Sequence, residues 1–346
     1  MDGDLVFVTK YFAAIGPISV HLPEKIESNA DLKADNPRWD MDLIASKTGI
    51  HNRHIAAEDE TSADLGVAAC EKLFAEFDVD PASIDFLLFC TQTPDFALPT
   101  TACLMQQRLG LRNDCGSLDF NLGCSAYPYG LSIADGLIQT GVAKRVLLVT
   151  AETYSKLIDK NDRSVRTIFG DGAAATLVEA HEEQSLSGFK FGTDGSGANL
   201  LCVMPNTPGG FRKTGQDFQP QRKRRWKSEL FMDGPRLINF TLSEIPKLID
   251  QILESAETSK DELDQYLVHQ ATFKMLDMLR QKIEVEASKV PVELADVGNT
   301  VSSTIPILIN QLRGQNRLSR DQKNILIGFG VGLSWSGCVW KDVIQP

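Results

Sequence analysis

Short apolar runs alternate with helical patterns along most of this chain, and that alternation limits the folds open to it more than any other feature. Runs with strand character lie at 84–90, 117–121, 145–150, 266–268 and 324–328. Helical patterns lie at 61–77, 101–109, 125–141, 243–256 and 272–283. Strands that alternate with helices are typical of an α/β protein, and we expect mainly parallel sheets.

The chain also shows a rough two-fold rhythm, which predicts two halves. A strand pattern leads into Cys124 and a helix in the first half, and a strand pattern leads into His269 and a helix in the second. Its 346 residues are too many for one small core. Glycine and turn residues gather at about 180–230, so we place the boundary at the start of that stretch, giving halves 1–180 and 181–346.

Composition and charge limit the kinds of binding partner and the cellular compartment that we expect for this chain. A net charge of -11 argues against nucleic acid as the main partner. No apolar stretch reaches the roughly 18 residues of a membrane span, and the first residues lack a signal-peptide pattern. Seven cysteines, with no CxxC pair and no metal-ligand spacing, fit free thiols in a reducing, cytoplasmic setting. Cys103 is among those expected to fill the core.

One basic segment stands out on this acidic chain. Residues 212–227, RKTGQDFQPQRKRRWK, hold seven lysines and arginines and a single acid, Asp217. The segment is consistent with a phosphate-bearing or acidic partner at that place. A solvated loop explains it equally well, so both interpretations stay open.

Cys124 occupies an unusual position, directly between a strand pattern and a helix pattern. At the first turn of a helix, exposed N–H groups and the helix dipole favour negative charge, so a thiol there is expected to shift toward thiolate. Gly123 permits a tight corner and leaves room beside the sulfur. The residues therefore suggest a nucleophile. The alternative is a small residue chosen for packing, and Cys115 is a weaker candidate because it precedes its strand.

Two polar residues in the second half could assist such a thiol. His269 is the one histidine of five that directly follows an apolar strand pattern, where parallel sheets bind ligands, and it would suit acid–base work. Asn299 offers an uncharged donor for an oxyanion or enolate. The alternatives are a buried histidine bonded to backbone and an asparagine that forms a turn.

Two glycine-rich segments complete the set of candidates. Residues 169–175, FGDGAAA, would let chains approach closely, and residues 328–335, GFGVGLSW, could present backbone N–H groups to an oxyanion. Neither segment has the Walker A spacing or the dinucleotide fingerprint.

The order of these motifs resembles the 3-oxoacyl-acyl-carrier-protein synthase III group of the thiolase superfamily. The motifs are a cysteine at a small-residue helix start, FGDGAAA, HQA, GNT followed by small residues and proline, and a glycine-rich segment ending in WSG. The agreement runs from Lys47-Thr48-Gly49-Ile50 to the C-terminus and includes Thr93-Pro94-Asp95. The resemblance implies a thiolase-like, five-layered α/β/α/β/α fold of two pseudo-symmetric halves, and a homodimer.

The resemblance also implies a chemistry. Cys124 would be the acylated nucleophile, and His269 and Asn299 would donate hydrogen bonds to a thioester oxygen and stabilise an enolate. The backbone N–H groups of Cys124 and of the Gly330–Val331 region would form the oxyanion hole. The reaction would be a decarboxylating Claisen condensation of an acyl thioester with a malonyl thioester. No permanent cofactor or metal is expected.

Thioester carriers account for further positions in the resemblance. Coenzyme A and acyl carrier protein both present phosphopantetheine, and Arg163, Lys47 and Thr272 would lie on that side, with Lys274 at a carrier-docking position. Leu98 takes the place of a phenylalanine that commonly closes the acyl pocket from the partner subunit.

Three departures from the family pattern bear on the substrate. HQAN is His269-Gln270-Ala271-Thr272 here, Leu43 replaces an adenine-stacking tryptophan, and Leu98 replaces the pocket phenylalanine. A related acyltransferase, which would move the acyl group to a hydroxyl or amine with His269 as base, is therefore an alternative, as is a non-enzymatic thiolase-fold protein. Retention of Asn299 favours condensation.

Overall fold

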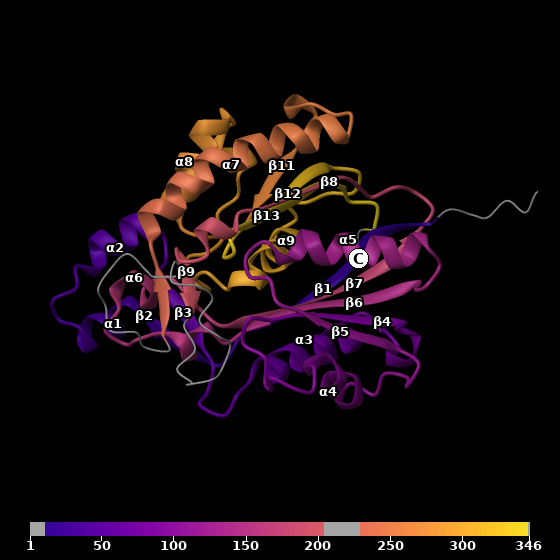
Figure 1. Ribbon diagram of the computed structural model, residues 1–346, viewed down its shortest axis with the longest axis horizontal. Helices are drawn as coiled ribbons and strands as arrows, with labels where there is room; N and C mark the ends of the chain where they lie inside the picture. The colour runs from indigo at the N-terminus through magenta and orange to yellow at the C-terminus, as the bar shows by residue number, and fades with distance from the viewer. Residues whose placement is uncertain (1–10, 204–228, 345–346) are drawn as a thin grey trace, which may run out of the picture.

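Two sheets, each covered by helices on both faces, organise the computed structural model, which describes residues 11–203 and 229–344 (Figure 1). The basic segment 212–227 lies outside these residues. The first sheet has the order β1-β7-β6-β4-β5 and the second β11-β12-β13-β8. Their strands are β1 (Phe12–His21), β4 (Phe86–Cys90), β5 (Gly116–Phe120), β6 (Arg145–Glu152), β7 (Gly172–His181), β8 (Leu186–Thr193), β11 (Gln265–Val268), β12 (Lys323–Gly330) and β13 (Ser334–Lys341).

Helices form three layers around these sheets, with α5 and α9 in the middle (Figure 1). Helices α3 and α4 cover the outer face of the first sheet, and α7 and α8 cover that of the second. The five-layered α/β/α/β/α expectation is therefore confirmed. The bounds are α3 (Ser62–Glu76), α4 (Thr101–Arg108), α5 (Ala126–Gln139), α7 (Gly234–Ser255), α8 (Phe273–Ile283) and α9 (Thr304–Gly314).

Smaller elements gather at one end of the molecule, on the left in Figure 1. They comprise two short antiparallel ladders, β2 with β3 and β9 with β10, and three short helices. Their bounds are β2 (Lys25–Ser28), β3 (Asn52–Ile55), β9 (Leu201–Val203), β10 (Leu230–Met232), α1 (Asn29–Asp35), α2 (Met41–Thr48) and α6 (Arg163–Arg166). Six 3₁₀ turns connect elements of the described chain: Pro81–Ser83, Tyr154–Leu157, Gly195–Gly197, Lys260–Glu262, Ala287–Lys289 and Val301–Ser303.

The middle helices form the centre of the hydrophobic core. Leu131 of α5 and Leu308 of α9 pack with Leu148 of the first sheet and Leu326 of the second, and all four side chains are fully buried. Each fully buried leucine contributes roughly 1.5–3 kcal/mol relative to exposure. Because both sheets share these helices, the first turns of α5 and α9 are held in fixed positions between them.

The expectation of mainly parallel sheets is wrong, since both large sheets are mixed. Strand β4 pairs in parallel with β5 and β6, and β11 with β12. The pairs β1–β7, β6–β7, β12–β13 and β13–β8 are antiparallel. The alternation with helices identified only the parallel strands. Strands β12 and β13 are joined directly by residues 331–333, and the connection of β6 to β7 through residues 153–171 contains only one 3₁₀ turn and the short helix α6. Cys103 is exposed and does not fill the core.

The two sheets repeat one topology. The order β1-β7-β6-β4 in the first matches β8-β13-β12-β11 in the second, with the same sequence of antiparallel and parallel pairs. This repeat supports the pseudo-symmetric halves. The boundary between 180 and 181 stays a prediction, and it falls at the last residues of β7, just before the chain enters β8 of the second sheet.

Candidate active site

Cys124 lies between β5 and α5, buried against the end of β12. A Cβ added at Gly330 would stand 3.0 Å from the Cys124 Cβ and 3.1 Å from its Sγ, and one at Gly328 would stand 2.6 Å from the Cys124 carbonyl oxygen. Only glycine permits the end of β12 to approach the sulfur so closely. The glycine-rich segment predicted from the sequence therefore forms one wall beside the thiol.

The ionisation of Cys124 differs from the expectation based on its helix start. Burial raises the pKa of the Cys124 thiol, and the nearby Glu152 carboxyl adds to the rise. A helix terminus contributes about 0.3–2 kcal/mol to an anion, whereas full burial shifts a pKa by up to about 3–5 units. Burial is the larger effect, so the resting form of Cys124 is the neutral thiol.

His269 directly follows β11, and its backbone N–H donates to the Ile327 carbonyl at 2.8 Å. Its ring is buried, and the Phe329 ring lies edge-on to it with 5.6 Å between the ring centroids. The Nδ1 atom lies 2.7 Å from the Thr304 hydroxyl oxygen. Burial lowers the pKa of His269 to about 3, so the imidazole is neutral near neutral pH.

The segment that precedes β7 holds the backbone of Asn299 in place. Its backbone N–H donates to the Ile168 carbonyl at 2.9 Å, and its carbonyl accepts from the Gly170 N–H at 3.1 Å. The side-chain oxygen Oδ1 accepts from the Val301 N–H at 2.9 Å. That bond fixes the orientation of the amide, which leaves the Nδ2 group as its donor. Gly298, with φ of 70°, makes the turn predicted there.

Contacts connect these three residues into one region of the fold. The Thr304 hydroxyl oxygen lies close to His269 Nδ1 and 3.2 Å from the Val301 carbonyl oxygen. The Val301 N–H in turn donates to the side-chain oxygen of Asn299. Val301 and Cys124 belong to the same apolar cluster. The sequence-predicted catalytic residues thus gather where the end of β12 meets the first turns of α5 and α9, while their roles stay predictions.

Two backbone N–H groups predicted to bind an oxyanion are available in the described part of the chain. Neither the Cys124 N–H nor the Val331 N–H donates to another described residue. A Cβ on Gly123 would stand 2.8 Å from Val331 Cγ1, so the segments that carry the two groups pack against each other. Gly330, the residue before Val331, approaches the Cys124 sulfur closely.

The residues predicted to bind the carrier lie apart from Cys124, on exposed helix positions. Lys47, Arg163 and Lys274 are exposed on α2, α6 and α8, and these helices lie at one end of the molecule (Figure 1). Thr272 is the N-cap of α8, since its hydroxyl accepts from the Met275 N–H at 3.3 Å.

Leu98 lies in the loop between β4 and α4 and is 84% exposed. Its side chain is therefore not enclosed by the rest of the described chain. Phe96 in the same loop is 56% exposed. This loop presents two large apolar side chains to the outside of the subunit.

Sequence reasoning missed a buried carboxyl beside the site. Glu152, the last residue of β6, accepts from the Ser302 hydroxyl at 2.8 Å, the Gln92 N–H at 2.9 Å and the Thr93 hydroxyl at 3.3 Å. Burial raises its pKa to about 8. Its place at the carboxyl end of a parallel strand was the signal that could have revealed it.

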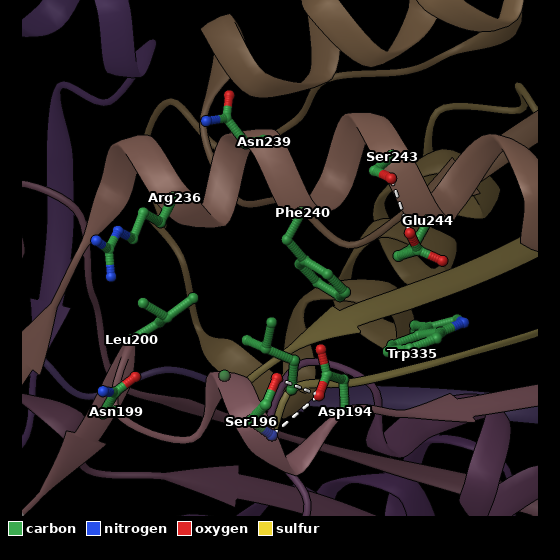
Figure 2. A pocket seen from close by; sticks show the side chains of 12 residues that line it. Asp194, Ser196, Asn199, Leu200, Arg236, Asn239, Phe240, Ser243, Glu244 and Trp335 are labelled. Carbon is green, nitrogen blue, oxygen red and sulfur yellow. Dashed lines mark hydrogen bonds between the residues drawn. The ribbon is translucent and has the colours of Figure 1, made fainter. Parts of the chain in front are cut away.

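A separate hollow of about 590 Å³ lies between α7 and the loop after β8 (Figure 2). Figure 2 shows the Phe240 ring pointing from α7 toward Trp335, with Asp194 beside Trp335 and Arg236 at the opposite end of the hollow. None of the predicted site residues lines it. Leu333 lines the hollow and also belongs to the apolar cluster of Cys124, so the hollow abuts that cluster from outside.

The described residues hold neither a metal-binding cluster nor a membrane-spanning helix. Residues 11–203 and 229–344 contain no group of three or more histidine, cysteine, aspartate or glutamate side chains placed to hold a metal. Within the same residues, every helix is too short or too polar to cross a membrane.

Comparison with known proteins places the chain among its relatives. Residues 118–195 match the family model 3-Oxoacyl-[acyl-carrier-protein (ACP)] synthase III, and residues 253–342 match its C-terminal model. The β-ketoacyl-[acyl-carrier-protein] synthase III of Lactococcus lactis subsp. lactis is 36% identical over 335 residues, which are 95% of this chain and 98% of that protein.

Solved structures agree with the sequence comparison. A 3-oxoacyl-(acyl-carrier-protein) synthase III crystal structure is 43% identical with a TM-score of 0.90, covering 95% of this chain and 99% of the other. The 3-oxoacyl-(acyl-carrier protein) synthase of Burkholderia xenovorans is 35% identical with a TM-score of 0.87, covering 97% and 96%. The matches extend over both sheets, the Cys124 segment and the segments of His269 and Asn299, and the chain therefore belongs to the 3-oxoacyl-[acyl-carrier-protein] synthase III family.

Proposed function

We propose that this protein is an acyltransferase that condenses an acyl-CoA with malonyl-acyl carrier protein, releases CO2 and gives a 3-oxoacyl product for fatty acid or related lipid and polyketide synthesis. The observation that carries the proposal is the contact of Gly330 with the Cys124 sulfur, next to the group formed by His269, Thr304, Val301 and Asn299. This arrangement combines a thiol nucleophile with two uncharged hydrogen-bond donors.

The first half of the reaction loads the enzyme. The Cys124 sulfur bonds to the carbonyl carbon of the acyl thioester, the bond from that carbon to the coenzyme A sulfur breaks, and the thiol proton ends on coenzyme A. The N–H groups of Cys124 and Val331 would stabilise the tetrahedral oxyanion. The surrounding apolar cluster, which includes Phe169, Leu237 and Leu333, suits a bound acyl chain.

The second half forms the new carbon–carbon bond. The malonyl carboxylate leaves as CO2, and its bonding electrons pass into the thioester carbonyl to give an enolate. His269 and Asn299 would donate hydrogen bonds to the enolate oxygen. The enolate carbon then bonds to the acyl carbon, the bond to the Cys124 sulfur breaks, and the thiolate takes one proton from water. Two neutral donors stabilise the enolate without repelling the incoming malonyl charge.

The carrier is proposed to approach the end of the molecule formed by α2, α6 and α8. Lys47, Arg163 and Lys274 give this end exposed positive charge, which attracts phosphates and an acidic carrier protein. Thr272 uses its hydroxyl to cap α8 and would offer the pantetheine arm less than an asparagine side chain does. The seven lysines and arginines of segment 212–227 would also favour an acidic carrier.

We also propose a homodimer in which Leu98 closes the acyl pocket of the partner subunit. Its exposure fits a side chain that is covered only in an assembly. Among the described strands, β5 lies at the edge of the first sheet with β4 as its one neighbour, and Leu118 on it is 43% exposed. Light scattering would test the dimer. Leu98→Phe should shift the accepted acyl chain toward shorter lengths, and unchanged selectivity would oppose the assignment of Leu98.

Mass spectrometry of Cys124 after exposure to a panel of acyl-CoAs tests the loading step. One acyl group should appear on Cys124, and Cys124→Ala should abolish it. Cys103→Ser, which removes an exposed thiol, is the matched control and should load normally. An adduct on any other cysteine would contradict the mechanism. CO2 release with malonyl-acyl carrier protein tests condensation, and transfer of the acyl group without CO2 would identify the simpler acyltransferase instead.

A further inference from the structure

Three consecutive hydroxyl residues lead into α9, and each has a different partner. The Ser302 hydroxyl donates to Glu152 Oε1 at 2.8 Å, and the Ser303 hydroxyl donates to a backbone carbonyl of β6 at 3.0 Å. The Thr304 hydroxyl oxygen lies 2.7 Å from His269 Nδ1. The first two bonds attach the start of α9 to the first sheet. The third reaches across to the residue after β11, in the second sheet.

The Thr304 contact determines which nitrogen of His269 carries the proton. A neutral imidazole bears one hydrogen, and its position follows from the hydrogen bond that the other nitrogen makes. If the Thr304 hydroxyl donates to Nδ1, the hydrogen is on Nε2. If it donates to the Val301 carbonyl instead, it accepts from Nδ1, and Nε2 is bare. The hydroxyl oxygen lies 2.7 Å from Nδ1 and 3.2 Å from the Val301 oxygen, and these distances suit both arrangements. The donor role that the proposed function gives to Nε2 selects the arrangement in which Thr304 donates to Nδ1.

We propose that Thr304 is a positioning residue that donates to His269 Nδ1 and thereby holds the imidazole with its proton on Nε2. This inference rests on the proposed function, in which His269 must donate to the enolate oxygen. A bare Nε2 would face that oxygen with a lone pair and would oppose the loss of CO2. The hydroxyl of Thr304 thus sets whether His269 acts as a donor at all.

The surroundings leave the ring no substitute for this partner. His269 and Thr304 are each 2% exposed. Within the described residues, Thr304 is the one hydrogen-bond partner of the His269 ring, and Phe329 packs edge-on against it. Removing the hydroxyl would leave a buried ring nitrogen unsatisfied in either tautomer.

The test compares Thr304→Val, which keeps the shape and removes the hydroxyl, with Thr304→Ser, which restores it. Thr300→Val is the matched control, because the Thr300 hydroxyl is buried in the same turn with no partner there. Nitrogen-15 NMR of ¹⁵N-histidine protein reports the tautomer, and the His269→Gln variant identifies the His269 signals among those of five histidines.

The expected result is the Nε2–H tautomer in the native protein, in Thr304→Ser and in Thr300→Val, and its loss in Thr304→Val. Decarboxylation by the acylated Thr304→Val enzyme should fall roughly 10- to 100-fold, while loading of Cys124 stays unchanged. An Nδ1–H tautomer in the native protein would overturn the proposal. So would the kinetic loss without a change of tautomer. If the native protein releases no CO2, the proposed function fails, and the spectra still decide whether Thr304 sets the tautomer.

Discussion

Replacement of Glu152 by glutamine should change how the stability of the protein depends on pH. Glu152 is fully buried, and its pKa is raised from 4.5 to about 8 by burial. A raised pKa in the folded state stabilises the fold below the ordinary value, and that stabilisation is lost as the pH rises toward the folded value. For Glu152 the loss falls between pH 4.5 and about 8.

The magnitude follows from one proton that is bound in the folded chain and absent in the unfolded chain. Each pH unit in this window costs about 1.4 kcal/mol, so the native protein should lose about 2.5 kcal/mol of unfolding free energy from this group between about pH 5.5 and about pH 7.5. Glu152→Gln should lack that loss. Its amide oxygen can still accept from the Gln92 N–H, and its amide N–H can donate to the Ser302 hydroxyl oxygen, which reverses the bond that Ser302 now donates.

Urea unfolding at several pH values, at one protein concentration, measures the difference between the two proteins. The native and Glu152→Gln curves of unfolding free energy against pH should diverge through this window. Glu254→Gln, in an exposed position of α7, is the control and should run parallel to the native curve. If Glu152→Gln also runs parallel to the native protein, Glu152 is ionised in the fold and the reasoning from burial is refuted.

Two substitutions and one alkylation experiment test the site directly. Asn299→Asp should leave the loading of Cys124 within about 3-fold and lower condensation by roughly 100-fold, as measured by acyl-enzyme mass spectrometry and CO2 release; equal loss of both steps would mean a structural role. Gly330→Ala should slow loading about 10-fold or more, because its Cβ would stand 3.1 Å from the sulfur, whereas Gly136→Ala in α5, which has open space, should load normally. Alkylation of Cys124 by iodoacetamide should still be accelerating at about pH 9, since burial raises its pKa, and a plateau near neutral pH would show that the thiolate is stabilised instead.

Residues that follow parallel strands were predicted from the sequence more accurately than the other strands and the helix ends. Cys124 and His269 follow strands β5 and β11, whose apolar runs were visible, and the ends of such strands are where polar side chains collect. Strand β13 was missed because its two serines and its glycine interrupt the apolar pattern that marks a strand. Helix α7 begins at Gly234, well before the predicted 243, because Asp233 caps it and Pro235 suits its first turn.

Other parts of the site could not be predicted because they depend on contacts between distant segments. The Thr304 hydroxyl looks like one more polar residue at a helix start until the fold brings β11 beside it. The neutral state of Cys124 likewise depends on burial by β12 and on the carboxyl at the end of β6. Spacing along the chain carries no information on either contact.

The repeated topology of the two sheets has a consequence for how such an enzyme can diverge. Cys124 precedes α5 and Asn299 precedes α9, the two helices of the middle layer. In the proposed mechanism, the two halves of this repeat supply the nucleophile and one of the enolate donors from the starts of these helices. Substitutions in the half that carries Cys124 can change which acyl group is accepted. They need not alter the surroundings of Asn299 in the other half, where CO2 would be lost. A repeated fold of this kind would let the acyl-chain preference change while the decarboxylating residues stay the same.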